Sequence, residues 1–211
     1  MKSYIVAISG ASGSVYSIRL IKELLKAGHR VYLTISKQAF SIIKTETGIN
    51  WVGDLPAGRQ SSTLRAGNSE IEIEKNMQKY FSSKHIRFFN ENNLHAPISS
   101  GSFITNGMLV VPCSMKTLSG IANGYASNLT ERAADVILKE GRRLIIAPRE
   151  MPFSAIHLEN MLKLARLGVN IAPPVPAFYH KPENIDDIVD FVVGKLLDIA
   201  GIRHNLFKRW K

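Results

Sequence analysis

The sequence predicts an α/β protein of the doubly wound class, with a mostly parallel sheet covered by helices. Two observations favour this class. Short apolar runs rich in β-branched residues alternate along the 211 residues with helical patterns of ten or more residues. The first run, Ser3 to Ser9, ends in the small-residue turn Gly10-Ala11-Ser12-Gly13, after which a helical pattern begins. Parallel strands need such crossover helices, so the alternation indicates a parallel, Rossmann-like sheet.

Pattern and end signals place the elements of the first half. Apolar residues recur at helical spacing from Val15 to Leu25, and Gly28 ends this helix. Lys22 and Lys26 lie near its end, where cations suit the helix dipole and glycine suits the left-handed cap. The same signals predict strands over residues 30–35 and 85–89, and helices over residues 38–46 and near 72–80.

The second half continues the alternation. Its predicted strands cover residues 108–111, 143–147 and 169–172, and its predicted helices cover residues 114–121, 129–139, 154–167 and 185–200. The length suits one domain, residues 1–211. Residues 54–69 contain glycine, serine and proline without a clear period, so we expect a divergent loop or insertion at about residues 49–97.

Composition limits the class of protein. Hydrophobic residues make up 45% and charged residues 21% of the chain, which is typical of a globular protein and excludes a disordered or membrane-spanning one. Apolar runs such as Tyr4 to Ile8 are far shorter than the roughly 20 residues that span a bilayer, and we expect no signal peptide. Cys113 is the single cysteine and no zinc-type spacing occurs, so we expect no metal and a cytoplasmic location.

The charge balance favours an anionic partner. Lys and Arg number 27 and Asp and Glu 17, a net charge of +10, which suits nucleic acid, an anionic membrane or a phosphorylated small molecule. A solvated basic surface explains much of the excess, and the RNA-binding motif with stacking aromatic residues is absent. We therefore expect neither nucleic acid nor membrane as a partner.

The segments that follow the predicted strands contain the candidate site, because ligands of such sheets bind beyond the carboxyl ends of the strands. The turn Gly10 to Gly13 can bring backbone amides to an anion, or can serve only tight packing; its spacing is neither a dinucleotide fingerprint nor a Walker loop. Pro112 to Thr117 places hydroxyls and Lys116 at a second helix start. Cys113 is expected to be a buried, structural residue.

Two proline-stiffened segments complete the candidate edge. Arg149 and Glu150 lie between Pro148 and Pro152, where they could bind an anion and handle a proton, or form an ordinary salt bridge. After the last predicted strand, the proline-rich residues 173–180 carry Tyr179, which could contact a ligand or merely pack.

Several spaced motifs are specific enough to indicate a family. They are Gly10-Ala11-Ser12-Gly13, Ser36-Lys37, Thr45-Glu46-Thr47, Ser100-Gly101-Ser102, Pro112-Cys113-Ser114 with Lys116 to Ser119, Glu131 to Val136 with Leu138-Lys139-Glu140, Pro148-Arg149-Glu150, His157 to Met161, and Pro173-Pro174 to Tyr179-His180. With them the chain resembles the flavin prenyltransferases of the UbiX type, over most of residues 1–48 and 98–211.

The resemblance implies a flavoprotein fold and an enzyme that joins a dimethylallyl group from dimethylallyl monophosphate to reduced FMN, at N5 and C6, without a metal. The residues that it implies for FMN are Gly10, Ala11, Ser12, Ser36, Ser114, Met115, Lys116, Thr117 and Arg149. Those implied for the isoprenoid phosphate are Lys139, Tyr179, Lys195 and Arg132, with Ser12, Glu46 and Glu150 as catalytic residues. The resemblance also implies a homododecamer, and a UbiD-type decarboxylase that receives the prenylated FMN.

One departure and two alternatives accompany this resemblance. The family commonly has arginine where the last helix has Lys195, which keeps the charge and loses the bidentate fork, so phosphate affinity is in question. An FMN-dependent cysteine decarboxylase shares the expected fold, but it relies on a histidine in the first half, and His29 is expected away from the crevice. A non-enzymatic FMN-binding protein is the second alternative.

Overall fold

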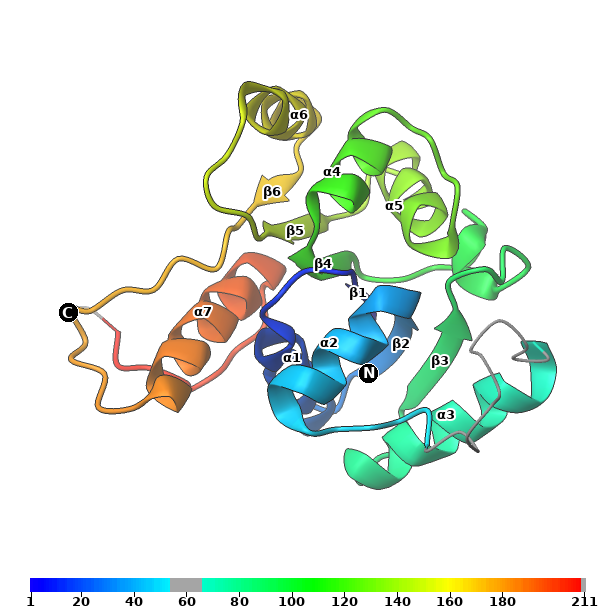
Figure 1. Ribbon diagram of the computed structural model, residues 1–211, viewed down its shortest axis with the longest axis horizontal. Helices are drawn as coiled ribbons and strands as arrows, with labels where there is room; N and C mark the ends of the chain where they lie inside the picture. The colour runs from blue at the N-terminus through cyan, green and yellow to red at the C-terminus, as the bar shows by residue number, and fades with distance from the viewer. Residues whose placement is uncertain (54–65, 210–211) are drawn as a thin grey trace.

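The computed structural model describes residues 1–53 and 66–209, with the backbone alone for residues 66–69, and six strands form one sheet in the order β3-β2-β1-β4-β5-β6 (Figure 1). Every pairing between these strands is parallel. The strands are β1 (Ser3–Ile8), β2 (Arg30–Ile35), β3 (Ile86–Asn90), β4 (Met108–Cys113), β5 (Leu144–Pro148) and β6 (Asn170–Ile171). The doubly wound class that the sequence predicts is confirmed.

The helices connect these strands. In chain order they are α1 (Ser14–Lys26), α2 (Lys37–Thr47), α3 (Ala66–Tyr80), the 3-10 helix η2 (Pro97–Ser99), α4 (Met115–Ala122), α5 (Leu129–Lys139), α6 (Ala155–Arg166) and α7 (Ile185–Ala200). Side chains cap many of the starts: Ser36, Ser114, Asn128 and Ser154 each accept a hydrogen bond from a backbone N–H in the first turn.

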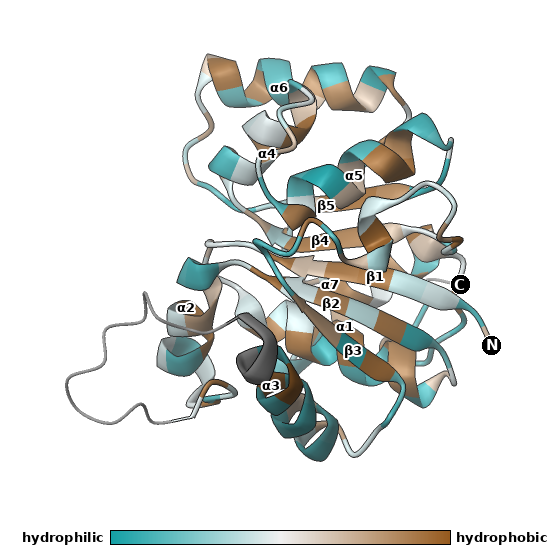
Figure 2. Ribbon diagram, turned by 90° about the vertical axis from the view of Figure 1, so that its right-hand side faces the viewer, coloured by the Kyte–Doolittle hydropathy of each residue, from teal (hydrophilic) through white to brown (hydrophobic). Residues whose placement is uncertain are grey.

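The sheet separates two apolar layers. Helices α1, α2, α3 and α7 cover one face, where Leu20, Leu33 and Val193 are among the buried side chains. Helices α4 and α5 cover the other face together with η2, and α6 packs outside α4. Figure 2 shows α4, α5 and α6 together on one side of the sheet. Strands buried on both faces account for the nearly continuous apolar runs in the sequence.

Helix α3 and the last strand differ from their predicted lengths. Helix α3 begins at Ala66, whereas the sequence predicts it only near residues 72–80, because Gly67 and Asn68 are poor helix formers. Ile73 and Met77 bury this helix in the same layer as α1, so this described part of region 49–97 belongs to the core, while residues 54–65 lie outside the described residues. Strand β6 covers two residues of the four predicted.

Helix α6 leaves an apolar surface uncovered. Ile156, Leu158, Leu162 and Leu167 are 68%, 53%, 50% and 62% exposed, all on or directly after this helix, which lies away from the sheet in Figure 1. We call these four residues the α6 apolar residues. Among the described residues, no helix is long and apolar enough to cross a membrane.

Candidate active site

The carboxyl ends of β1 and β4 meet at the centre of the sheet. These strands are neighbours, and the chain leaves them towards opposite faces, so a crevice forms between the two connections. The Ser9 side chain joins the two strand ends, since its hydroxyl donates to the Pro112 carbonyl at 2.8 Å and accepts from the Ser114 N–H at 2.7 Å. This bridge fixes the position of the α4 start relative to the turn at Gly10.

A first cavity of about 220 Å³ lies at this crevice. It is lined by side chains from the ends of four strands and from the α5 start: Ser9, Gly10, Ser36, Gln38, Glu91, Ser114, Lys116, Thr117, Asn128 and Thr130. Five residues expected to bind FMN from the resemblance are therefore brought together here, namely Gly10, Ser36, Ser114, Lys116 and Thr117.

A second cavity of about 370 Å³ lies on the other side of the Gly10 to Gly13 turn. It is lined by Ser12, Gly13, Val15, Tyr16, Glu46, Arg149 and Pro174. The backbone at Gly13 has a φ of 104°, and a β-carbon there would lie 3.0 Å from the Tyr16 ring, so this turn requires glycine. The two cavities have no lining residue in common, but both are lined by residues of the loop that follows β1, Ser9 and Gly10 in the first and Ser12 and Gly13 in the second.

Glu46 occupies the start of α1. Its carboxylate accepts hydrogen bonds from the backbone N–H groups of Gly13 and Ser14, at 3.0 and 2.8 Å, and from the Ser14 hydroxyl at 2.6 Å. Burial opposes ionisation of Glu46, but the Ser12 and Ser14 hydroxyls and these backbone groups outweigh it and hold its pKa below the usual value. The α1 start is thus neutralised by the chain itself.

Helix α2 begins in a similar way, whereas α4 does not. The Glu91 carboxylate accepts from the Lys37 N–H at 2.6 Å, which places a negative group on the α2 start. Helix α4 has no acidic residue in its first turn, and Lys116 adds a cation there. Of these three helix starts, α4 therefore offers the most favourable place for a phosphate. From the sequence, the α1 and α4 starts are equally good candidates for an anion site. The Glu46 carboxylate at the α1 start shows that, of these two starts and among the described residues, only the α4 start is free of a bound carboxylate.

Arg149 and Tyr16 set the electrostatics of the second cavity. The Arg149 N–H donates to the Cys113 carbonyl at 3.0 Å, which fixes the backbone just beyond β5 at the cavity. Burial raises the pKa of the Tyr16 phenol; the Arg149 charge lowers this pKa and the Glu46 charge raises it. Tyr16 is therefore a neutral phenol at pH 7 that is influenced by the charges of both Arg149 and Glu46.

Five candidate residues lie outside both cavities in the single chain. The Glu150 carboxylate accepts from the Met151 N–H, and Arg132 donates to the Ser99 carbonyl and to Asp135. At the opposite end of α5 from the first cavity, Lys139 is paired with Glu140 at 3.0 Å. The last two, Tyr179 and Lys195, lie on the 173–184 segment and on α7.

Three further residues have no comparable contact with the cavities. Ala11 lies in the turn that joins them, and its N–H donates to the Ser9 carbonyl. Met115 is partly buried and packs on the apolar layer below α4. Cys113 is fully buried, which raises the pKa of its thiol to about 12 and removes it as a nucleophile at neutral pH.

Several lining residues are not predicted from the sequence. Gln38, Glu91, Asn128 and Thr130 line the first cavity, and Tyr16 the second. Glu91 directly follows β3, so its place after a strand is a signal that could have identified it. Tyr16 gives no such signal, because it fits the apolar period of α1. His29 packs on Tyr4 beside β1's first residues, at the opposite edge of the sheet.

The fold and the two cavities define a doubly wound α/β protein with a candidate ligand site at its topological switch point. The Flavoprotein family model matches residues 1–197. The chain is 48% identical over 206 residues to the flavin prenyltransferase UbiX of Methanocaldococcus jannaschii, covering 98% of this chain and 97% of that protein.

Two solved structures are similar as well. The dodecameric FMN-dependent UbiX-like decarboxylase of Escherichia coli O157:H7 has a TM-score of 0.82 and 41% identity, with 99% of each chain covered. AnUbiX (PadA1), in complex with FMN and dimethylallyl pyrophosphate, has a TM-score of 0.83 and 38% identity, covering 100% of this chain and 97% of that one. The chain therefore belongs to the Flavoprotein family, and within it to the UbiX flavin prenyltransferases.

Proposed function

We propose that this chain transfers a dimethylallyl group from dimethylallyl monophosphate to N5 and C6 of reduced FMN, and that a UbiD-type decarboxylase receives the product. The observation that carries the proposal is the pair of cavities beside the loop that follows β1. In the first cavity, the α4 start with Lys116 suits a nucleotide phosphate, and in the second cavity Arg149 supplies another cation. We place this activity in one flavoprotein domain, residues 1–211, in the cytoplasm.

The residues present fit FMN. Ser114 and Thr117 supply hydroxyls, and the α4 start supplies backbone N–H groups without a competing carboxylate in its first turn. Gly10 leaves room beside Gln38, because a β-carbon at Gly10 would lie 3.1 Å from that side chain. When bound, FMN supplies the flavin ring whose N5 and C6 accept the prenyl group.

The chain's own residues then act on charge and protons. Cleavage of the allyl C–O bond leaves its electron pair on the phosphate, and the cations of Lys139 and Lys195 stabilise the charge that develops there, while Arg149 binds FMN. The Ser12 hydroxyl donates a hydrogen bond to the Glu46 carboxylate, which fixes the orientation of the Ser12 side chain in the second cavity. We assign to Glu150 the exchange of a proton with the departing phosphate.

This assignment needs more than one copy of the chain. Arg132, Lys139, Tyr179 and Lys195 line neither cavity, so we propose that neighbouring subunits bring them to the second cavity of another copy. The exposed α6 apolar residues support association, because an interface with another subunit would remove these side chains from water. We propose a homo-oligomer, a dodecamer as in the Escherichia coli relative.

The mass of the flavin product tests the proposal. Purified protein, reduced FMN and dimethylallyl monophosphate are combined without oxygen, and the flavin is analysed by mass spectrometry. We expect a flavin that is heavier by one prenyl unit, and an unchanged mass contradicts the proposed reaction. A parallel reaction with the diphosphate tests the donor: a higher rate with the diphosphate would replace the monophosphate in our assignment.

A further inference from the structure

We propose that the C-terminal segment 203–209 is a clasp that positions Tyr179. It does so by holding Phe191 of α7, the side chain on which the Tyr179–His180 pair packs. Figure 1 shows this segment running back along α7 towards the 173–184 segment. The proposal rests on the proposed function, in which Tyr179 contacts the isoprenoid phosphate, and it makes Phe207 a positioning residue.

Charged contacts fasten the segment to the end of α7. Arg209 donates two hydrogen bonds to the Asp198 carboxylate, at 2.6 and 3.1 Å. The His204 Nε2 lies 3.2 Å from the same carboxylate, and its Nδ1 accepts from the Leu206 N–H at 3.2 Å. Since Nδ1 accepts, the ring proton lies on Nε2 and is donated to Asp198. The side chain of His204 is only 1% exposed, so this contact is part of the packed structure.

A glycine within α7 makes room for the clasp. A β-carbon at Gly194 would lie 2.4 Å from the Phe207 ring and 2.7 Å from the His204 ring. Glycine inside a helix is unfavourable relative to alanine, so this position does not favour α7 taken alone. Close approach of the two rings is the structural reason for glycine here.

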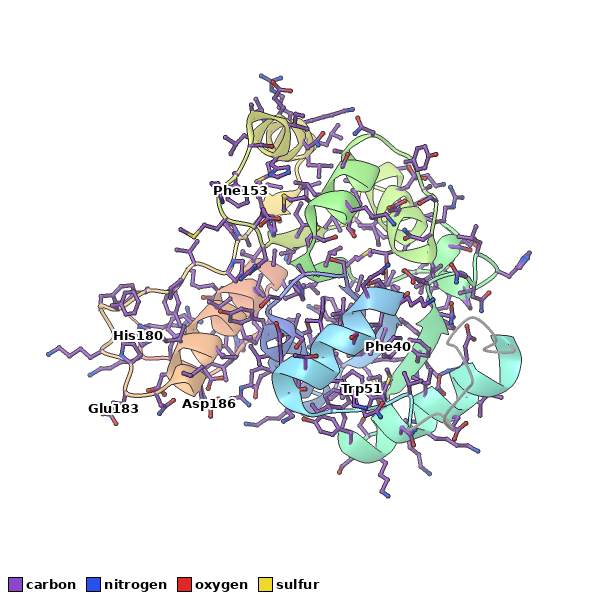
Figure 3. All side chains as sticks on the ribbon, viewed as in Figure 1. Phe40, Trp51, Phe153, His180, Glu183 and Asp186 are labelled. Carbon is purple, nitrogen blue, oxygen red and sulfur yellow. The ribbon has the colours of Figure 1, made fainter. Side chains whose placement is uncertain are left out.

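Stacked rings connect the clasp to Tyr179. The Phe207 ring centroid is 5.1 Å from that of Phe191. The His180 ring is stacked on Phe191 at 5.0 Å with an interplanar angle of 10°, and the Tyr179 ring meets Phe191 edge-on at 5.7 Å. Figure 3 labels His180 beside α7. Phe191 is 7% exposed, so Phe207 and Tyr179 pack on a side chain that is otherwise enclosed.

The clasp lies on the same helix as Lys195. Phe191, Gly194 and Asp198 are spaced i, i+3 and i+7, so they form one stripe along α7, and Lys195 borders it one position after Gly194. The 173–184 segment begins at the second cavity, where Pro174 is a lining residue, and leads to Tyr179. The clasp is therefore placed to set the position of Tyr179 relative to Lys195.

The test compares Phe207→Ala with two controls, Lys208→Ala, which changes an exposed neighbour, and Phe207→Tyr, which keeps the ring. We measure backbone hydrogen exchange by mass spectrometry in peptides that contain the Lys181 amide, which donates to the Phe178 carbonyl. We also measure KM for dimethylallyl monophosphate, kcat and the Kd for FMN. Gly194→Ala is a second variant that displaces Phe207 while favouring the α7 helix.

For Phe207→Ala and Gly194→Ala we expect faster exchange at the Lys181 amide. We also expect the KM for dimethylallyl monophosphate to rise by up to about tenfold, which corresponds to the stabilisation that one aromatic pair contributes. The Kd for FMN is expected to stay within about twofold and the two controls to match wild type. Unchanged exchange in both variants overturns the clasp, and so does faster exchange with unchanged KM. If wild type forms no prenylated flavin, the proposed function fails, while the exchange measurement still decides whether the clasp holds the segment.

Discussion

Glu46→Gln tests whether a carboxylate from α2 stabilises the start of α1. The substitution keeps the size of the side chain and one accepting oxygen, but it removes the charge to which Gly13, Ser14 and the Ser12 hydroxyl donate. Loss of a helix cap costs about 1 kcal/mol, and solvent screening reduces the charge contribution because Glu46 is exposed. We expect the free energy of unfolding to fall by about 0.5–1 kcal/mol at pH 7.

The pH dependence separates the charge from the hydrogen bonds. The folded pKa of Glu46 is below its usual value of 4.5, so its stabilising effect is complete above about pH 4.5 and is lost as the pH falls towards the folded pKa. The difference between wild type and Glu46→Gln should therefore shrink between pH 5 and pH 3, a range of roughly two units.

Thermal unfolding at a fixed protein concentration measures this difference. For a chain of this size, the expected loss corresponds to a Tm lower by about 1–4 °C at pH 7. Glu72→Gln, a change at an exposed glutamate of α3, serves as the control and should leave Tm unchanged. A Tm difference that is equally large at pH 3 and pH 7 would refute the electrostatic reasoning, as would no difference at pH 7.

The remaining predictions concern the two cavities and the buried thiol. Arg149→Ala should weaken FMN binding by roughly 10- to 100-fold, measured by fluorescence titration, because it removes charged hydrogen bonds. Glu150→Gln should bind FMN like wild type and lose roughly 100-fold in kcat; equal loss of FMN in both variants would show that the two roles are misassigned. Lys116→Ala should weaken FMN binding and reduce its dependence on salt, and an unchanged salt dependence would remove Lys116 from the phosphate site. Cys113 should react with an alkylating reagent only after unfolding, because its thiol is buried and its pKa is about 12.

The sequence predicts the sheet well because its strands are buried on both faces. Such strands appear as short apolar runs bounded by glycine and polar residues, and all six runs correspond to strands. The alternation of these runs with helical patterns predicts parallel strands joined by crossover helices, whereas the strand order comes from the structure. The start of α3 is not predictable in this way, because contacts with β3, in which Glu70 and Glu74 accept from the Asn90 and Phe88 N–H groups, anchor the helix.

The site is predictable where it follows strand ends and is not where distant side chains converge. Ser114 is found because it lies at a helix start directly after a strand, whereas Ser36, a cap in the same kind of position, comes from the family resemblance. Glu46 lies late in α2, more than thirty residues from the turn that it contacts, and only the packing of α2 beside α1 brings them together. The local pattern therefore gives no reason to expect that the α1 start is already neutralised.

The exposed α6 apolar residues have a consequence for how the protein behaves in dilute solution. A single subunit leaves Ile156, Leu158, Leu162 and Leu167 in water. Dilution favours single subunits over oligomers, so dilute protein should adsorb more readily to vessel walls and bind detergent. Sulfate salts strengthen the burial of such side chains and should drive dilute protein into larger particles. Yield and shelf life of purified samples should thus depend on concentration as well as on temperature.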